Sequence, residues 1–290
     1  MKYMNKIFRF INKRILRLFW SLHINLLKKN NKFKDIETNK TCIIIGNGSS
    51  LKYYNYDAFN NYTCISTSYL LYDNRAKKLN IKYYVIPDSY ITYPFLINSY
   101  DHSVQWNYIA PLLKGLVYKF KKTFFFTRLE NRYGFLRVPK NLHFVFDEKS
   151  NIPNQYDLSG SFNTFKGSLD FMLGLAKYLG FKKVYLAGCD YLGSPAVNGH
   201  FYSYTDPNVV NEDLFVDYKK RINKLIVDLN LDVELILPKG QQSKLFKYKN
   251  FETFFKYKES NLKNEDIVEN NILNIMKKGH KKRQIFLWTN

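Results

Sequence analysis

The stretch Lys40-Thr-Cys-Ile-Ile-Ile-Gly-Asn-Gly-Ser-Ser-Leu51 joins a short apolar run to a glycine-rich turn. Residues 42–45 are all apolar, as in a parallel strand that is buried on both faces. The turn Gly46-Asn47-Gly48-Ser49-Ser50 ends that run. Its glycines permit a tight turn and a close approach to a ligand, and its N–H groups and Ser hydroxyls suit phosphate or ribose oxygens. The turn lacks the lysine of a Walker A loop and the third glycine of a dinucleotide fingerprint, so a turn without a ligand remains an alternative.

Further apolar runs and helical patterns alternate along the chain. Residues 165–179 and 212–229 each place apolar side chains on one helical face, and Gly180 fits the end of the first helix. This alternation predicts an α/β fold with a doubly wound, mostly parallel sheet. The other predicted strands are Thr63–Thr67, Tyr83–Ile86, Phe124–Thr127, Phe144–Phe146, Val184–Ala187 and Val233–Leu237.

A second candidate site follows the predicted strand Val184–Ala187. Its residues are Gly188-Cys189-Asp190-Tyr191 and, in the loop beyond, Asn198-Gly199-His200-Phe201-Tyr202. Ligands of open α/β sheets bind at the carboxyl ends of the strands, which places Asp190 beside a ligand. A histidine near a carboxylate is a candidate general base, so His200 is the candidate here. The alternative is an Asp that caps the loop and a His on the surface.

A third candidate segment, Ser159-Gly-Ser-Phe-Asn-Thr-Phe-Lys-Gly-Ser168, precedes the helix predicted over residues 165–179. Small hydroxyl and amide residues at the start of a helix serve as N-caps, and the same geometry suits a bound anion. Both interpretations remain open for this segment.

The two ends of the chain differ from its middle. Residues 1–33 contain nine Lys and Arg and no acid, and their spacing predicts a basic amphipathic helix. Its charges are too frequent for a transmembrane span or a signal peptide. Such a helix suits an anionic membrane surface, or else it docks on its own domain. We therefore expect a membrane-associating helix over residues 1–35, a catalytic α/β domain over 36–246 and a basic, aromatic appendage over 247–290.

Composition narrows the environment and the partners. The formal net charge of +21 favours polyanions such as nucleic acid, acidic membranes or phosphorylated substrates. The three cysteines, Cys42, Cys64 and Cys189, show no metal-binding spacing. They are expected to be free thiols in a reducing, cytoplasmic compartment.

Three motifs, taken in order, resemble bacterial lipooligosaccharide sialyltransferases. Ile43-Ile-Ile-Gly-Asn-Gly-Ser-Ser-Leu51 resembles their opening strand and loop, where the family reads Gly-Asn-Gly-Pro-Ser-Leu. Leu179-Gly-Phe-Lys-Lys-Val-Tyr-Leu-Ala-Gly-Cys-Asp-Tyr191 resembles their second core strand, and Ile236-Leu-Pro-Lys-Gly-Gln-Gln-Ser243 resembles a late strand with its Pro. Motility accessory factor proteins and pterin-pyrophosphokinase-like families carry related motifs. The resemblance covers about residues 40–245 and implies a Rossmann-like, GT-A-variant fold.

The resemblance also implies functions for individual residues. In the family the loop Asn contacts the nucleotide sugar, which is Asn47 here. The small residues before the long helix bind the carboxylated donor, which corresponds to Gly167 and Ser168. Tyrosines after the acidic strand end contact the donor phosphate, and Tyr191 and Tyr202 match them loosely.

The chain departs from the family pattern at several positions. The family's second Asn falls at about Thr67, and its third at about Ile86, next to Pro87 and Asp88. The Arg expected before the donor-binding Ser is absent, and Lys166 is the nearest cation. A donor other than CMP-sialic acid is therefore compatible with the sequence.

The sequence thus leads to the hypothesis of a sialyltransferase-like glycosyltransferase acting in lipopolysaccharide, lipooligosaccharide or capsule synthesis. His200, the family's catalytic His by position, is the expected base, Asp190 is the second expected catalytic residue, and no divalent metal or other cofactor is expected. The expected partners are a nucleotide-sugar donor, a glycolipid or oligosaccharide acceptor, the inner face of an anionic membrane and a second copy of the chain. A pyrophosphokinase-like phosphoryl transferase using ATP and Mg²⁺ is an alternative. A basic nucleic-acid-binding protein is another, although no nucleic-acid-binding motif is present.

Overall fold

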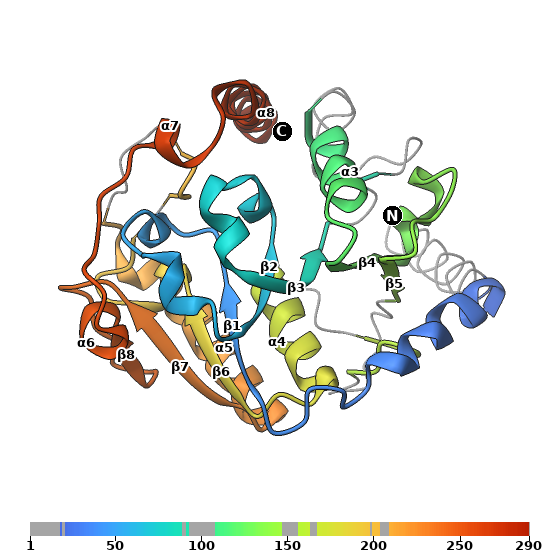
Figure 1. The fold of residues 1–290 in the computed structure, drawn as a ribbon, viewed down its shortest axis with the longest axis horizontal. Helices are drawn as coiled ribbons and strands as arrows, with labels where there is room; N and C mark the ends of the chain where they lie inside the picture. Colours follow the sequence, from blue (N-terminus) through green and yellow to red (C-terminus); the bar gives the residue numbers. More distant parts are fainter. Residues whose placement is uncertain are drawn as a thin grey trace, which may run out of the picture.

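The structure is a computed structural model that describes residue 18 and residues 21–88, 91–92, 108–146, 156–162, 167–197, 199–203 and 209–289. Over these residues the chain forms a single parallel sheet of eight strands covered by helices, an α/β Rossmann-like fold (Figure 1). The strands are β1 (Thr41–Ile45), β2 (Thr63–Thr67), β3 (Asn80–Ile86), β4 (Phe124–Arg128), β5 (Leu142–Val145), β6 (Lys183–Ala187), β7 (Asp232–Leu237) and β8 (Tyr248–Asn250).

The direction in which successive strands are added to the sheet reverses beside β1. The order is β5-β4-β3-β2-β1-β6-β7-β8, and every neighbouring pair is parallel. The chain therefore builds outward from β1 to β5, returns to the other side of β1 and builds outward again from β6. The carboxyl ends of β1 and β6 flank this topological switch point, where open α/β sheets bind their ligands.

Both faces of the sheet are buried, because alternate side chains of each strand enter different cores. On β1, Ile43 and Ile45 belong to one core, and Cys42 and Ile44 belong to the other. The first core includes side chains of α3 (Ala110–Lys119) and α8 (Asn270–Thr289), and the second includes those of α4 (Ser168–Leu179) and α5 (Val216–Leu229). Figure 1 shows these pairs of helices on opposite sides of the sheet.

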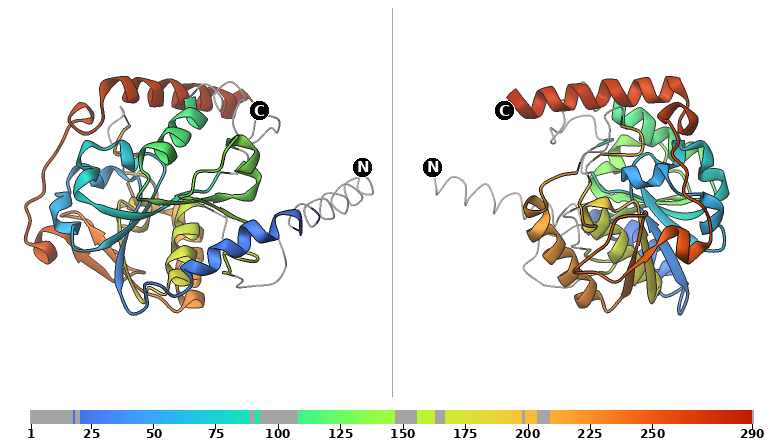
Figure 2. Two further views of the ribbon diagram at one scale, coloured as in Figure 1. Left: turned by 45° about the vertical axis from the view of Figure 1, so that its right-hand side comes forward. Right: turned by 90° about the vertical axis from the view of Figure 1, so that its left-hand side faces the viewer.

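The segment 247–290, expected as an appendage, contributes to the same sheet and the same core. Strand β8 pairs with β7, and Phe251 of α6 (Phe251–Phe255) stacks on Tyr54 with ring centroids 4.6 Å apart. After the short helix α7 (Asn264–Ile267), α8 buries Leu273 and Met276. Figure 2 shows α8 crossing above the end of α3, so the end of the chain covers this side of the core.

The N-terminal helix predicted over residues 1–35 lies largely outside the described residues. Its described end is helical over residues 21–28 and continues in η1 (Lys29–Phe33). This end docks on the domain: Leu27 is buried, and the Asn30 amide donates to the Phe144 and Leu158 carbonyls at 2.7 and 2.8 Å. Within the described ranges, no helix is both long enough and apolar enough to cross a membrane.

Candidate functional site

The glycine-rich turn after β1 packs directly against the turn after β6. The Gly46 and Gly48 N–H groups donate to the Ala187 and Gly188 carbonyls, each at 2.8 Å. A Cβ at Gly46 would lie 2.4 Å from the Gly188 oxygen, and one at Gly48 would lie 2.4 Å from the Asp190 carboxyl carbon. The close contact between the two turns therefore explains both glycines, and it does so without any ligand.

Asp190 fastens the two turns together. Its side chain is buried, with one carboxylate oxygen accepting from the Ser50 N–H at 2.9 Å and the Ser49 hydroxyl at 3.1 Å. The other oxygen accepts from the Ser50 hydroxyl at 2.5 Å. Burial raises the pKa of the Asp190 carboxyl, and the bonds from the serines lower it in part. Asp190 is the first residue of η8 (Asp190–Leu192). Its contacts are those of a residue that positions the glycine-rich turn.

His200 is held over the glycine-rich turn by the backbone on either side of it. Gly48 and His200 form an isolated antiparallel bridge, and the Phe201 N–H donates to the Asn47 carbonyl at 3.0 Å. The His200 ring stacks on the Tyr202 ring, with centroids 5.0 Å apart and planes 20° apart. The loop that follows β6 thus places His200 and Tyr202 beside the glycine-rich turn after β1, which is distant from them in the sequence.

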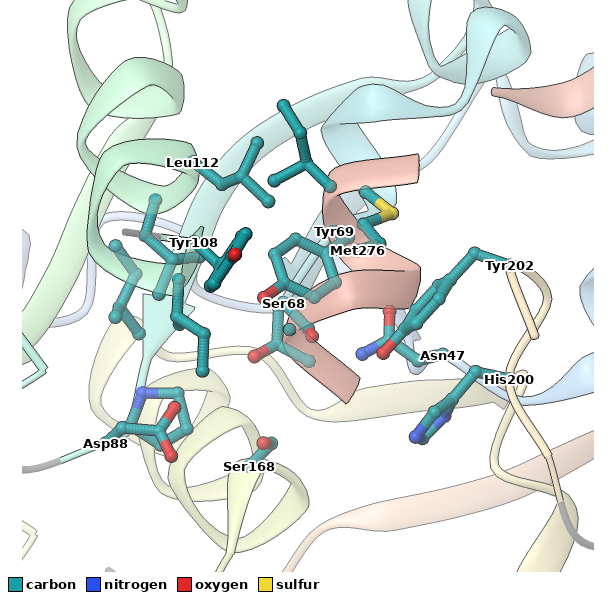
Figure 3. Close-up of a pocket in the computed structure, with 17 residues that line it drawn as sticks. Asn47, Ser68, Tyr69, Asp88, Tyr108, Leu112, Ser168, His200, Tyr202 and Met276 are labelled. Atoms are coloured by element: carbon teal, nitrogen blue, oxygen red, sulfur yellow. The ribbon is translucent and has the colours of Figure 1, made fainter. Parts of the chain in front are cut away.

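Two adjoining cavities open at this point. The switch-point cavity, of about 190 Å³, is lined by both turns, by the start of α4 and by Tyr218. The α8 cavity, of about 240 Å³, extends from the ends of β2 and β3 to α3 and α8 (Figure 3). The two cavities have four lining residues in common, namely Asn47, Thr67, Ser168 and His200.

The structure gathers most of the residues singled out in the sequence around these cavities. Gly46, Gly48, Asp190 and Tyr191 line the switch-point cavity only, and Asp88 and Tyr202 line the α8 cavity only. Three residues line neither of them: Gly167, Ser49 and Ser50.

The three outlying residues have structural surroundings of their own. Gly167 caps α4, and a Cβ there would lie 3.2 Å from Asp170. Ser49 and Ser50 bond to Asp190 and line a separate cavity of about 290 Å³ next to Glu259. Their expected contact with a ligand stays a prediction.

The first turn of α4 is fixed by an ion pair to α5. Asp170 is buried and accepts from both terminal nitrogens of Arg221, the second bond being 3.2 Å long. The Arg221 guanidinium also lies over the Tyr218 ring, 5.1 Å from its centroid. These contacts hold Ser168, the first residue of α4, in the wall that both cavities share.

Neutral hydrogen-bonding groups dominate this site. Among the described residues that line the two cavities, none is Lys or Arg. An anionic ligand would therefore be bound by hydroxyls, by the Asn47 amide and by N–H groups at the start of α4, where the helix dipole favours negative charge. The Asn47 side-chain oxygen is buried and has no hydrogen-bond partner within the described part of the chain.

Titratable groups beside His200 are held in their neutral forms. Burial, followed by the nearby Asp190, raises the pKa of the Cys189 thiol to about 12. The same two causes raise the pKa of the Tyr191 hydroxyl. Neither residue is ionised at neutral pH, so Cys189 is no thiolate nucleophile and Tyr191 remains a hydrogen-bond donor. The ring of Tyr191 stacks on Phe215 at 4.8 Å.

Several residues that line the cavities had no signal in the sequence. Tyr69 lies just after β2, and Tyr108 lies just before α3. Met276 lies in a Lys-rich stretch without a clear helical or strand pattern. Tyr218 belongs to the apolar face of the helix predicted over residues 212–229, and such a position gives no reason to expect it beside a ligand. Only the assembled fold brings these side chains to the switch point.

Two solved structures are similar to this chain. The sialyltransferase CstII from Campylobacter jejuni, in complex with the substrate analogue CMP-3FNeuAc, is 16% identical with a TM-score of 0.42, over 82% of this chain and 99% of that one. The MAf glycosyltransferase from Magnetospirillum magneticum AMB-1 is 10% identical with a TM-score of 0.43, over 91% of this chain and 42% of that one. No family model and no curated protein matches the sequence.

Proposed function

We propose that the chain is a glycosyltransferase that moves a sugar from a nucleotide-activated donor to a hydroxyl of a sugar acceptor. The observation that carries this proposal is the pair of adjoining cavities with His200 in their common wall. A two-substrate transfer needs two binding spaces that meet at the reacting atoms, together with a base at the meeting point.

In this proposal the donor occupies the switch-point cavity. Its nucleotide lies across the turns after β1 and β6, as ligands do in open α/β sheets. Its phosphate faces Ser168 at the start of α4, and Tyr191 donates a hydrogen bond to it. A CMP-linked, sialic-acid-like sugar is the donor that the sequence motifs favour.

The acceptor occupies the α8 cavity, with its reacting hydroxyl at His200. Neutral His200 takes the proton of that hydroxyl as the oxygen attacks the anomeric carbon. The bond between that carbon and the phosphate oxygen breaks in the same step, so the anomeric centre is inverted. The nucleotide leaves with both bonding electrons, and Ser168, Tyr191 and backbone N–H groups stabilise its charge. The proposal includes no divalent metal.

We further propose that the enzyme works at the inner face of an anionic membrane, where glycolipid acceptors are made. The basic composition of residues 1–35 supports this proposal. So do Leu18 and Leu22, whose side chains are 63% and 71% exposed on the helical segment that leaves the domain.

A thermal-shift titration with CMP, UDP, GDP and ATP, each with and without Mg²⁺, tests the proposed donor site. Ligand binding to the folded state raises the melting temperature by mass action. We expect a shift with one pyrimidine or guanine nucleotide that Mg²⁺ leaves unchanged. Ser168→Ala should weaken binding about fivefold through a lost hydrogen bond, and Ser21→Ala, on the N-terminal helix, is the matched control. A shift with ATP that requires Mg²⁺ would favour phosphoryl transfer, and no shift with any nucleotide would contradict the proposal.

A further inference from the structure

The α8 cavity has a polar end and an apolar end. Asp88, Ser168 and His200 lie toward α4 and the sheet, whereas Leu112 and Met276 lie toward α3 and α8 (Figure 3). Asp88 is the one acidic or basic residue, apart from His200, among the described residues that line this cavity.

The apolar end is built by two helices that the proposed transfer chemistry does not need. Helix α3 contributes Leu112 and Leu113, which are 6% and 4% exposed, and α8 contributes Met276, which is 6% exposed. Their packing leaves open space instead of closing over it. An apolar part of a ligand could therefore bury its surface against these side chains.

Gly279 keeps this apolar end open. It lies one helical turn beyond Met276, on the face of α8 that lines the cavity. A Cβ at this position would lie 3.3 Å from the Cβ of Tyr108, which lines the same space. A larger side chain here would enter the space or push Tyr108 into it.

We infer that the α8 cavity binds an acceptor in which the sugar at His200 is joined to an alkyl or aryl group. This inference rests on the proposed function and names its acceptor class. Sugar hydroxyls match Asp88, Ser168 and Ser68 at the polar end. Leu112 and Met276 offer no hydrogen bond to a second sugar, whereas an apolar group would bury its surface against them.

Paired acceptors measure this preference. Hexyl and methyl glycosides of galactose, glucose and N-acetylglucosamine are titrated into the nucleotide-bound protein below the micelle concentration, and binding is followed by ligand-observed NMR. The same pairs are then tested as acceptors for the donor whose nucleotide binds. We expect the hexyl glycoside to bind at least ~10-fold more tightly than its methyl partner, because several methylenes become buried.

Two variants locate the preference and one controls for it. Gly279→Leu fills the apolar end and Met276→Gln makes it polar, so each should reduce the hexyl preference to less than about twofold. The nucleotide affinity of both should stay at the wild-type value, which also reports that they fold. Asn274→Leu adds the same side chain to the exposed face of α8 and should keep the preference.

Equal binding of hexyl and methyl glycosides by the wild-type protein, or an equal preference in Gly279→Leu and Met276→Gln, overturns the inference. Sugar transfer without any preference would leave the proposed function intact. A hexyl preference in a protein that transfers no sugar would instead contradict the proposed function and leave the apolar subsite standing.

Discussion

Asp190 lies where a catalytic acid is expected, yet its hydrogen bonds are made to the neighbouring turn. Its position after a buried strand is typical of a ligand-binding acid, yet the Ser49 and Ser50 hydrogen bonds use both of its oxygens. In this account Asp190 sets the shape of the glycine-rich turn, and His200 alone exchanges the proton.

Substitution of Asp190 by Asn separates these two functions. The amide keeps one accepting oxygen but places an NH2 group where the second carboxylate oxygen accepted a hydrogen bond from the serines. Because one of these bonds is lost, we expect the nucleotide dissociation constant to rise about tenfold. The fall of kcat on the acidic side should be retained, because in this account His200 is the base. Asp157→Asn is the matched control, since Asp157 accepts from the N–H and hydroxyl of Ser159 in an exposed turn. Loss of the acidic limb in Asp190→Asn would instead identify Asp190 as the base.

His143 carries a pH dependence that is unrelated to catalysis. It is buried on β5 against Phe33, with ring centroids 4.7 Å apart, and its Nε2 has no partner among the described residues. Burial first, and then the charge of Lys32, lowers the pKa of this imidazole from 6.5 to about 3. The folded protein therefore keeps His143 neutral at pH values where the unfolded chain binds a proton.

The free energy of unfolding should consequently fall as the pH drops below 6.5, because the unfolded chain then binds a proton that the folded protein does not. This loss of stability should continue until about pH 3, where the folded protein also binds the proton. Between pH 7 and pH 5 the loss from one such group is about 2 kcal/mol. Denaturant unfolding of His143→Gln at the two pH values should show a loss smaller by that amount. His23→Gln should retain the wild-type difference. Equal losses in wild type and His143→Gln would show that His143 does not titrate as described.

At the scale of elements, a half-buried arginine holds the short helices that follow the glycine-rich turn. The Arg75 guanidinium, in η5 (Asn74–Lys78), donates to the Leu51 and Tyr54 carbonyls at 3.1 and 3.2 Å. It also bonds to Asp73 at 2.7 Å and lies 4.2 Å from the ring centroid of Tyr56. Arg75 thereby ties the segment that follows the turn to η5.

Arg75→Lys should lower the free energy of unfolding by about 3 kcal/mol. A lysine replaces the planar fork with one ammonium group, and the buried carbonyls and Asp73 lose donors. Lys78→Ala removes the exposed ion pair with Asp57, which is 2.7 Å long, and should cost less than about 1 kcal/mol. Denaturant unfolding of both variants measures the two losses in free energy of unfolding. Equal losses in Arg75→Lys and Lys78→Ala would show that the Arg75 contacts contribute no more than an exposed ion pair.

The elements of the sheet were largely accessible from the sequence, because buried parallel strands are short apolar runs. All seven strands predicted in this way are present, with β2 matching at both ends. Strand β8 escaped detection because Tyr248, Lys249 and Asn250 show neither alternation nor an apolar run. Helix α8 was equally hidden, since its apolar face is interrupted by lysines.

At the scale of the whole molecule, the site was predictable only in part. The order of motifs indicated that the turns after β1 and β6 would meet, since the carboxyl ends of parallel strands share one edge. The purpose of Gly46 and Gly48 was not visible, because it depends on the distance to Gly188 and Asp190. The α8 cavity is lined by segments more than 150 residues apart along the chain, such as those of Leu112 and Met276.

The basic residues that give the chain its net charge of +21 are unevenly placed on the molecule. The described lining of the two cavities contains no Lys or Arg, so the basic residues lie elsewhere on the molecule. This separation agrees with the proposed function, in which the surface meets an anionic membrane while the site binds one phosphate through N–H groups and hydroxyls.

The most direct test of the account is the initial rate of sugar transfer by His200→Ala, measured beside wild type and His23→Ala with the donor whose nucleotide binds. We predict that kcat of His200→Ala falls by a factor of about 10²–10⁴, as expected for loss of a general base. Its nucleotide dissociation constant should remain within about twofold of wild type, and His23→Ala should match wild type in both. A His200→Ala rate within about threefold of wild type would contradict the assignment of His200 as the base at the junction of the two cavities.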